Sequence, residues 1–169
     1  MKKILSISLA ALMMLAAVSC KKDETSQNSF VLDGVSYAVT AEISQHLLDF
    51  GSYELFFTLS NGNCFFITCN SSYDGKVIDL TKKTDPNNGS WSISGRIEEA
   101  QIQINGSGEY STGRFESGTL QVKKGNEGEG TIDFSIILKG GKVISNSDNK
   151  EHTIEVKFNG PVKLVAGFE

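Results

Sequence analysis

Histidine, proline and tryptophan are rare in this chain of 169 residues, which contains two, two and one of them respectively. His46 and His152 each stand alone, without a second histidine or a cysteine at metal-ligand spacing, so both are predicted to be surface residues. The chain has no G-x-S-x-G motif, and no spacing rule orders a serine, a histidine and an aspartate into a triad. The sequence therefore predicts no metal site, no cofactor and no enzyme activity.

The chain also lacks a carboxylate pair suited to glycoside hydrolysis. Glu98 and Glu99 are adjacent, and neighbours in a strand point to opposite faces, so they cannot flank one scissile bond. The glycine-rich segments 106–108 and 125–130 open no helix and are predicted to be turns, not phosphate loops. Residues 145–149 offer oxygen atoms but lack the spaced acidic residues of a calcium loop.

Positive charge is in deficit, with 16 lysines and arginines against 20 aspartates and glutamates and a net charge of −4. Removal of residues 1–19 takes away Lys2 and Lys3, leaving 14 basic against 20 acidic residues and a net charge of −6. This charge argues against nucleic acid or anionic lipid as a partner.

No apolar run is long enough to cross a membrane. The longest, residues 4–18, falls short of the roughly 20 residues that a spanning helix needs. It follows Lys2 and Lys3 and ends just before Cys20, the pattern of a secretory signal. Residues 1–19 are therefore predicted to be a signal peptide.

Residues 17–20, Ala-Val-Ser-Cys, resemble the lipobox of bacterial lipoproteins, although the family usually has leucine at the position of Ala17. The resemblance implies that Cys20 carries a diacylglyceryl group and that its new amino terminus is acylated, for example with palmitate. Several acyl chains, at about 0.8 kcal/mol per buried CH₂, make a permanent membrane anchor. The alternative is ordinary signal cleavage after Ser19.

Residues 21–24, Lys-Lys-Asp-Glu, are similar to the charged tetrad that in Bacteroidetes lipoproteins accompanies transfer to the exterior of the outer membrane. The alternatives are a domain that faces the periplasm and a plain solvated tether. Residues 20–28 are expected to be the lipidated cysteine and a disordered tether. Residues 21–28 reach at most roughly 26 Å when extended, which keeps the domain near the lipid surface.

Residues 29–169 are predicted to form a single β domain, since short apolar stretches are punctuated by most of the 17 glycines. About nine or ten short strands predict an antiparallel β-sandwich, with a lipocalin-like barrel as the alternative. With the signal in front of it, this pattern resembles many uncharacterised Bacteroidetes lipoproteins. That resemblance implies no catalytic residues.

The first hairpin is predicted at Asp33-Gly34, which supplies the positive φ angles of a type I′ turn between strands 30–32 and 35–41. Apolar residues alternate after this turn, and one buried face is predicted to hold Val35, Tyr37, Val39, Ala41 and Ile43. Residues 42–50 fit a helical turn as well as a strand.

A second two-residue turn is predicted at Asn61-Gly62, which would pair Phe57 with Phe66. In that register both faces of the hairpin are apolar, so strands 53–60 and 63–70 are predicted to be covered on both sides. Cys64 and Cys69 then point to opposite faces, roughly 16 Å apart along one strand, and cannot form a disulfide. Both are expected to be buried thiols.

Further strands are predicted where apolar residues alternate, at residues 76–81, 114–124, 131–139, 153–158 and 162–168, and a loop is predicted at residues 82–90. Trp91, Ile93 and Ile97 have odd residue numbers, whereas Ile102 and Ile104 have even ones. In one regular strand the two sets would point to opposite faces. A bulge or a tight turn near residues 98–99 is therefore required.

Aromatic residues near loops are the candidate ligand-binding residues, namely Trp91, Tyr73 and Tyr110. Trp91 lies on the same face of its predicted strand as Ile93, which favours a place in the core. Two functions fit the sequence: a non-enzymatic surface module that is structural or binds a glycan or a surface protein, and a small-ligand carrier. A carrier requires an unfilled interior, which inward residues such as Phe134, Ile136 and Val156 would line.

Overall fold

The computed structural model describes residues 28–82, 90–97, 102–107, 115–145 and 147–166. This part of the chain contains ten strands, one short α-helix and one 3₁₀ turn. The helix α1 spans Gln45–Asp49 and the 3₁₀ turn η1 spans Ser71–Tyr73. The strands are β1 (Ser29–Leu32), β2 (Val35–Ser44), β3 (Ser52–Leu59), β4 (Cys64–Asn70), β5 (Val77–Asp79), β6 (Trp91–Ile97), β7 (Ile102–Ser107), β8 (Phe115–Gly128), β9 (Thr131–Ile144) and β10 (Glu151–Val165).

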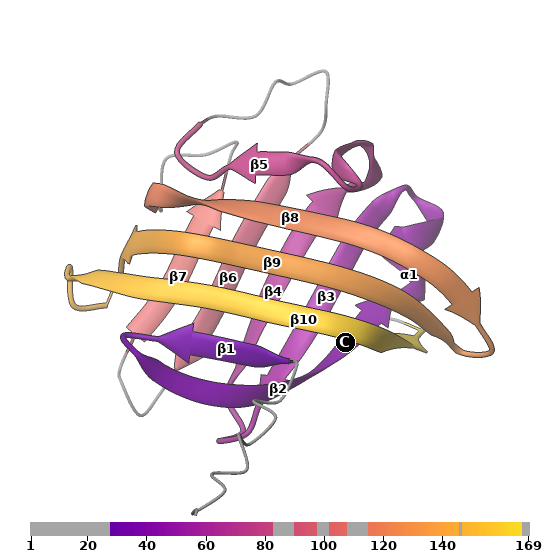
Figure 1. The fold of residues 1–169 in the computed structure, drawn as a ribbon, viewed down its shortest axis with the longest axis horizontal. Helices are drawn as coiled ribbons and strands as arrows, with labels where there is room; N and C mark the ends of the chain where they lie inside the picture. Colours follow the sequence, from indigo (N-terminus) through magenta and orange to yellow (C-terminus); the bar gives the residue numbers. More distant parts are fainter. Residues whose placement is uncertain (1–27, 83–89, 98–101, 108–114, 146, 167–169) are drawn as a thin grey trace, which may run out of the picture.

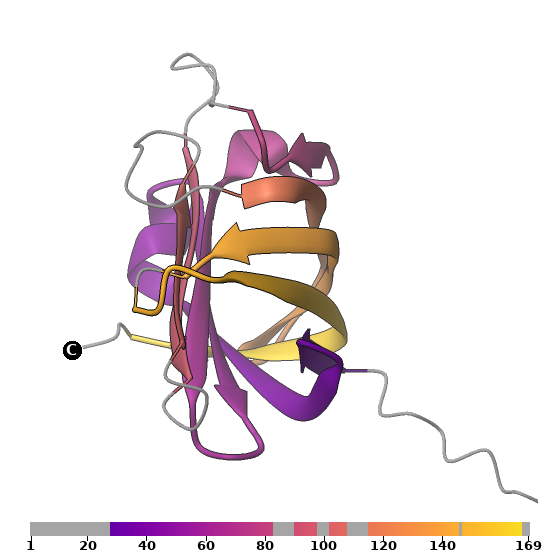
Figure 2. The same ribbon diagram turned by 90° about the vertical axis from the view of Figure 1, so that its left-hand side faces the viewer.

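All ten strands belong to one sheet in the order β5-β8-β9-β10-β1-β2-β3-β4-β6-β7. The sheet curls into a half-barrel, so that β8, β9 and β10 cross in front of β3, β4, β6 and β7, with β1 and β2 at the bend (Figure 1). Seen edge-on, the two halves form two facing layers (Figure 2). The predicted all-β, antiparallel class and the predicted number of strands are confirmed. The one exception is a parallel pairing of β2 with the end of β10.

The core fills the space between the two layers. Ring contacts cross that space, with Tyr53 of β3 edge-on to Phe134 of β9 at 5.3 Å and Phe57 of β3 edge-on to Phe158 of β10 at 5.8 Å. Alternate residues of β9 and β10 are buried, as their sequence pattern predicts. Such interlayer burial is the main source of stability in a sheet protein.

The first hairpin forms as predicted. Asp33 and Gly34 have φ angles of 49° and 81°, as a type I′ turn requires, and Leu32 pairs with Val35. The predicted buried face is wrong at its start, since Val35 is 54% exposed. Val35 is the first residue of β2 and follows the turn directly. The ambiguous residues 42–50 contain the end of β2 and the helix α1.

The second hairpin has a longer loop than predicted. Leu59 N–H donates to the Asn63 carbonyl and Gly62 N–H to the Leu59 carbonyl, with Gly62 at φ 86°. These contacts define a three-residue loop with glycine in the left-handed position. Phe57 therefore pairs with Phe65, not Phe66.

This shift by one residue exchanges the two faces of β4. Phe65, Ile67 and Cys69 enter the core, whereas Phe56 and Phe66 form a half-buried pair on the outer face, 4.8 Å apart. The expectation that this hairpin is covered on both sides is wrong. The two cysteines do point to opposite faces and are unpaired, with Cys69 buried and Cys64 half-buried, so only one of the two predicted buried thiols is confirmed.

The apolar residues change from odd to even numbers after Ile97 because the chain turns back there and begins a second strand. Ile97 pairs with Ile102 in the antiparallel β6–β7 hairpin, and residues 98–101, including the predicted turn at 98–99, lie outside the described residues. The predicted turn at 106–108 is wrong for residues 106 and 107, which belong to β7. Residue 108 lies outside the described residues. Most of the predicted loop 82–90 also lies outside the described residues.

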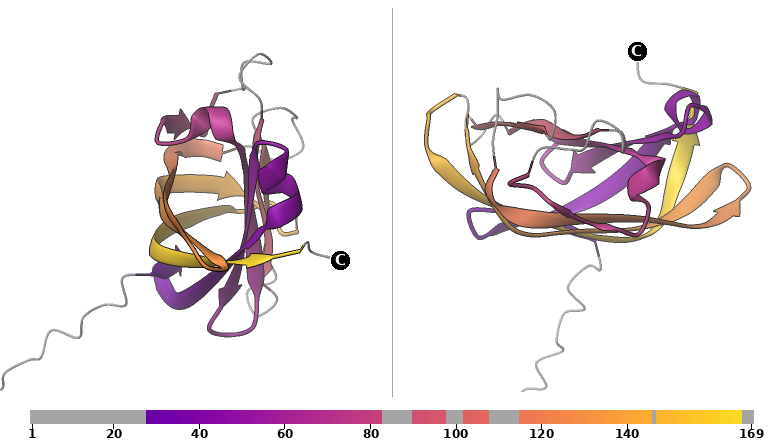
Figure 3. Two further views of the ribbon diagram at one scale, coloured as in Figure 1. Left: turned by 90° about the vertical axis from the view of Figure 1, so that its right-hand side faces the viewer. Right: turned by 90° about the horizontal axis from the view of Figure 1, so that it is seen from above.

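The predicted strands 153–158 and 162–168 are one continuous strand, β10, in its described part. Pro161 is accommodated because β10 pairs with β1 before it and with β2 after it, leaving an interval in which β9 is its hydrogen-bonded neighbour. A bulge around Gly141 bends the neighbouring strands, and a Cβ there would lie 2.8 Å from the Ile154 carbonyl oxygen. Figure 3 shows the resulting curvature of β8, β9 and β10.

Candidate functional site

Of the candidate ligand-binding residues, Trp91 lies in the core. Its side chain is 2% exposed and its ring is 6.3 Å from that of Phe115. Tyr73 in η1 is half-buried and packs against the core from the loop after β4. Tyr110 and Cys20 lie outside the described residues. Trp91 and Tyr73 therefore do not form a joint aromatic surface.

The structure brings together a polar cluster that sequence reasoning missed, made of Asp33, Asp148 and His152. The prediction that His152 is a surface residue is wrong, because it is 9% exposed. Its Nδ1 lies 2.5 Å from Asp33 Oδ2, and its Nε2 lies 3.2 Å from Asp148 Oδ2. Asp33 also accepts a 2.8 Å hydrogen bond from Thr153 N–H. We call these three side chains the histidine clamp, because they join the β1–β2 turn to the β9–β10 turn.

Hydrogen bonds determine the charges of the histidine clamp. Burial works against the charged form of His152, but hydrogen bonds to Asp33 and then to Asp148 raise its pKa above 6.5. Burial likewise opposes the charge of Asp33, and the hydrogen bonds from His152 and Thr153 lower its pKa. The hydrogen bond from Lys150 N–H lowers the pKa of Asp148 most, and the hydrogen bond from His152 lowers it further. An imidazole between two ionised carboxylates can satisfy both only by donating from both nitrogens, which favours the charged form of His152.

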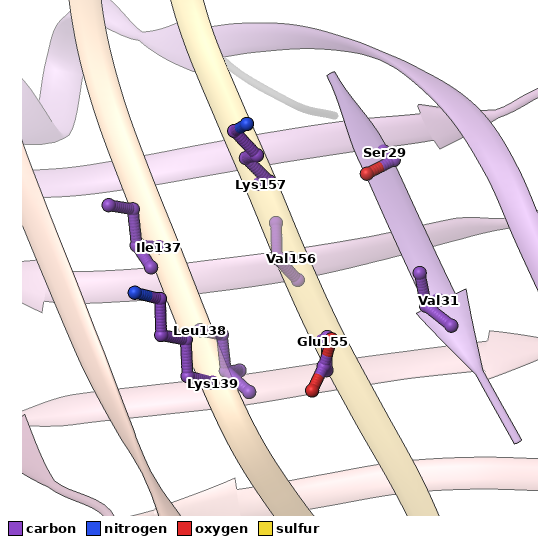
Figure 4. A pocket seen from close by; sticks show the side chains of 8 residues that line it. All are labelled: Ser29, Val31, Ile137, Leu138, Lys139, Glu155, Val156 and Lys157. Carbon is purple, nitrogen blue, oxygen red and sulfur yellow. The ribbon is translucent and has the colours of Figure 1, made fainter. Parts of the chain in front are cut away.

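A shallow groove of about 320 Å³ runs over the outer faces of β1, β9 and β10 (Figure 4). Val31 and Ile137 are half-buried in it, and the exposed side chains of Lys139, Glu155 and Lys157 stand around them. Leu138 and Val156 point through the sheet into the core. The groove therefore has an apolar floor with charges of both signs at its rim.

A second depression, of about 380 Å³, is lined by α1, the end of β8, the start of β9 and residues of β3, η1 and β10, and is called the end hollow. Its polar lining comes from both layers: Gln45 and Asp49 of α1, and Lys124 and Glu127 of β8. Leu48 is among its apolar lining residues. The lining thus combines hydrogen-bonding and apolar groups.

Asp74 contacts two of the residues that line the end hollow, Lys124 and Tyr53. Asp74 Oδ1 accepts a 2.7 Å hydrogen bond from Lys124 N–H, so it ties the loop after η1 to β8. Burial, and then the charge and hydrogen bond of Asp74, raise the pKa of Tyr53 to about 12. Burial and Asp74 likewise raise the pKa of Cys69 to about 12. Both groups are therefore neutral near neutral pH.

The described residues contain no group of three or more histidine, cysteine or acidic side chains placed to hold a metal ion. In the same described part of the chain, no helix is long and apolar enough to cross a membrane. No protein-family model, no curated protein and no solved structure matches this chain.

Proposed function

We propose that this chain is a lipid-anchored surface module that binds a partner without catalysing a reaction on it. Cys20 carries the acyl chains, residues 20–28 form the tether, and residues 29–169 form the binding domain at the exterior of the outer membrane. Ser29, the first residue of β1, is paired with both β10 and β2. The tether therefore enters the domain at a strand that is paired on both sides.

The packed interior is the observation that supports a surface module over a small-ligand carrier. Phe134, Ile136 and Val156 would line the cavity of a carrier, yet they are 1%, 0% and 2% exposed. Phe134 contacts Tyr53 across the layers. A ligand site buried between the layers would need about 300 Å³ or more of free space. The partner, a glycan or a surface protein, is therefore expected to bind at the outside of the domain.

The histidine clamp supports the non-enzymatic part of the proposal. A general base needs a free nitrogen within reach of the proton that it removes. Both nitrogens of His152 face carboxylates of the same chain, so this imidazole has none to offer. Its hydrogen bonds join two turns and leave no atom for a substrate.

Native mass spectrometry of the lipidated protein, purified from the membranes that produce it, tests the proposal. A surface module should have the mass of the acylated chain alone. One noncovalent small molecule other than a sugar, retained per chain and released on unfolding, would contradict the proposal and favour the carrier.

Protease added to intact cells tests the location. An exterior domain should be removed while the outer membrane is intact. Protection until that membrane is opened would instead place the domain in the periplasm.

A further inference from the structure

A bulge in β8 places Glu127 on the same face of the strand as Lys124. Lys124 and Glu127 are three residues apart, so they would point to opposite faces of a regular strand. Here Lys124 pairs with Phe134 and Glu127 with Ile132, so β8 advances by three residues where β9 advances by two. Phe134 and Ile132 are buried in the core. Lys124 and Glu127 therefore share the face of β8 that continues into the core, but at its solvent-exposed end: their side chains are 26% and 68% exposed, and Nζ and Oε1 are 2.5 Å apart.

A second polar pair lines the same end hollow from the other layer. Gln45 Nε2 donates a 2.7 Å hydrogen bond to Asp49 Oδ1 on α1. Leu48 and Leu164 add apolar surface beside the two pairs. Bulges interrupt the ladder and commonly re-aim side chains next to binding sites. Core packing does not explain this bulge, because the side chain that it brings to this face, Glu127, is charged and 68% exposed.

We propose that the end hollow binds a neutral carbohydrate unit of one or two sugar rings. The proposal rests on the surface-module function and specifies its ligand class. Sugar hydroxyls donate and accept, so they suit the carboxylates of Asp49 and Glu127 together with the donors of Gln45 and Lys124. The carbon face of a sugar ring suits Leu48. The volume of about 380 Å³ is at the small end of ligand sites.

The charge of the hollow argues against an anionic ligand. Its described lining carries one cation, Lys124, and two anions, Asp49 and Glu127, which gives a net charge of −1. Glu127 neutralises Lys124 directly, and the partner of Asp49 is the uncharged amide of Gln45. An anionic sugar would be repelled by the remaining carboxylate.

Titration of the full lipidated chain tests this proposal, in a detergent whose headgroup is not a sugar. The probes are glucose, galactose, mannose, N-acetylglucosamine, maltose and cellobiose, with sialic acid and glucosamine as charged comparisons, followed by ligand-observed NMR. The variants are Asp49→Asn and Glu127→Gln. Glu151→Gln is the matched control, because Glu151 forms an exposed ion pair with Lys142 at 3.1 Å outside the hollow.

At least one neutral sugar should bind the wild type and the control variant. Each of the two hollow variants should weaken that binding about tenfold, since hydrogen bonds to charged groups are the stronger ones. Binding of a neutral sugar that both variants leave unchanged would overturn the site but not the surface-module function. Binding of only a charged sugar, or of none, would overturn the ligand class. A retained small molecule in the interior would contradict the function itself, independently of these results.

Discussion

Asp33 Oδ2 and His152 Nδ1 are 2.5 Å apart although the two residues are separated by 119 positions in the sequence. The contact fastens the turn between β1 and β2 to the first residues of β10. Asp33 N–H donates to the Thr153 carbonyl at 3.0 Å, and Thr153 N–H donates back to Asp33 Oδ1. The short strand β1 is thus held at the end farther from the tether by main-chain and side-chain bonds together.

Stability should depend on pH through the histidine clamp. The pKa of His152 is raised above 6.5. The contribution of its charged form to the free energy of unfolding is therefore complete below pH 6.5 and is lost as the pH rises through the raised pKa. The pKa values of Asp33 and Asp148 are lowered from 3.8, so their contributions are present above about pH 3.8 and are lost as the pH falls. The clamp should therefore stabilise the domain most between these limits.

Asp33→Asn isolates the charge, because asparagine also accepts the positive φ of this turn. We expect the free energy of unfolding to fall by about 1 kcal/mol near pH 5, a modest value because Asp33 is 44% exposed and water screens it. The loss should shrink at alkaline pH, and the pKa of His152 should fall towards 6.5. Urea unfolding and NMR titration measure these effects, with Asp133→Asn as control. An equal loss at every pH would contradict the charge argument.

Trp91→Ala should destabilise the domain by about 3 to 5 kcal/mol, because it empties a large core site. That is a large part of the 5 to 15 kcal/mol typical of a domain. Trp91 is 2% exposed, so the wild type should emit at short wavelength and resist acrylamide. Val77→Ala, at a 65% exposed position, is the control and should change stability little. Red-shifted emission with a stable Trp91 variant would contradict the core placement.

The two hairpins show what local sequence can and cannot determine. Asp33-Gly34 and Asn61-Gly62 have the same turn signature, yet the first forms a two-residue loop and the second a three-residue loop. Glycine takes a positive φ in both. The register is then decided by which face the opposite layer buries, and this choice places Phe65 in the core. Alternation within one strand does not contain that information.

The histidine clamp and the end hollow were beyond sequence reasoning for a related reason. The partners of His152 come from one turn beside it and another 119 residues away, so no spacing rule connects all three. Lys124 and Glu127 share a face only because β8 is bulged between them. The predicted turn at residues 125–130 is wrong over 125–128, which belong to β8, and the glycine at position 125 did not reveal the direction of the side chains.

The two cysteines of β4 should differ in reactivity. The thiolate is the reactive form of cysteine, and with a pKa of about 12 Cys69 has about one thiol in 10⁴ ionised at pH 8. Its Sγ also donates to the Asn70 carbonyl at 3.4 Å. Cys64 is half-buried on the outer face. A thiol reagent should therefore modify Cys64 first, and Cys64→Ser should leave β4 unreactive until the domain unfolds.

Peptide mass analysis identifies the modified residue. Equal modification of Cys64 and Cys69 in the folded protein would contradict the burial of Cys69. A loss of two hydrogens within the unreduced chain would contradict the β4 strand itself, because a continuous strand keeps the two Cα atoms too far apart for a disulfide.

Metabolic labelling with a fatty acid should mark the wild-type protein and not Cys20→Ala, because the thiol of Cys20 is the proposed acceptor of the diacylglyceryl group. Cys64→Ala is the matched control and should be labelled like the wild type, since Cys64 lies within β4. An anchor of several acyl chains binds lipid almost irreversibly, so Cys20→Ala should also move from the membrane fraction to the soluble one. Equal labelling of wild type and Cys20→Ala would contradict the proposed lipid anchor at Cys20. The packing of the described residues and the end hollow would then belong to a protein without this anchor, and the carbohydrate titration would still test what it binds.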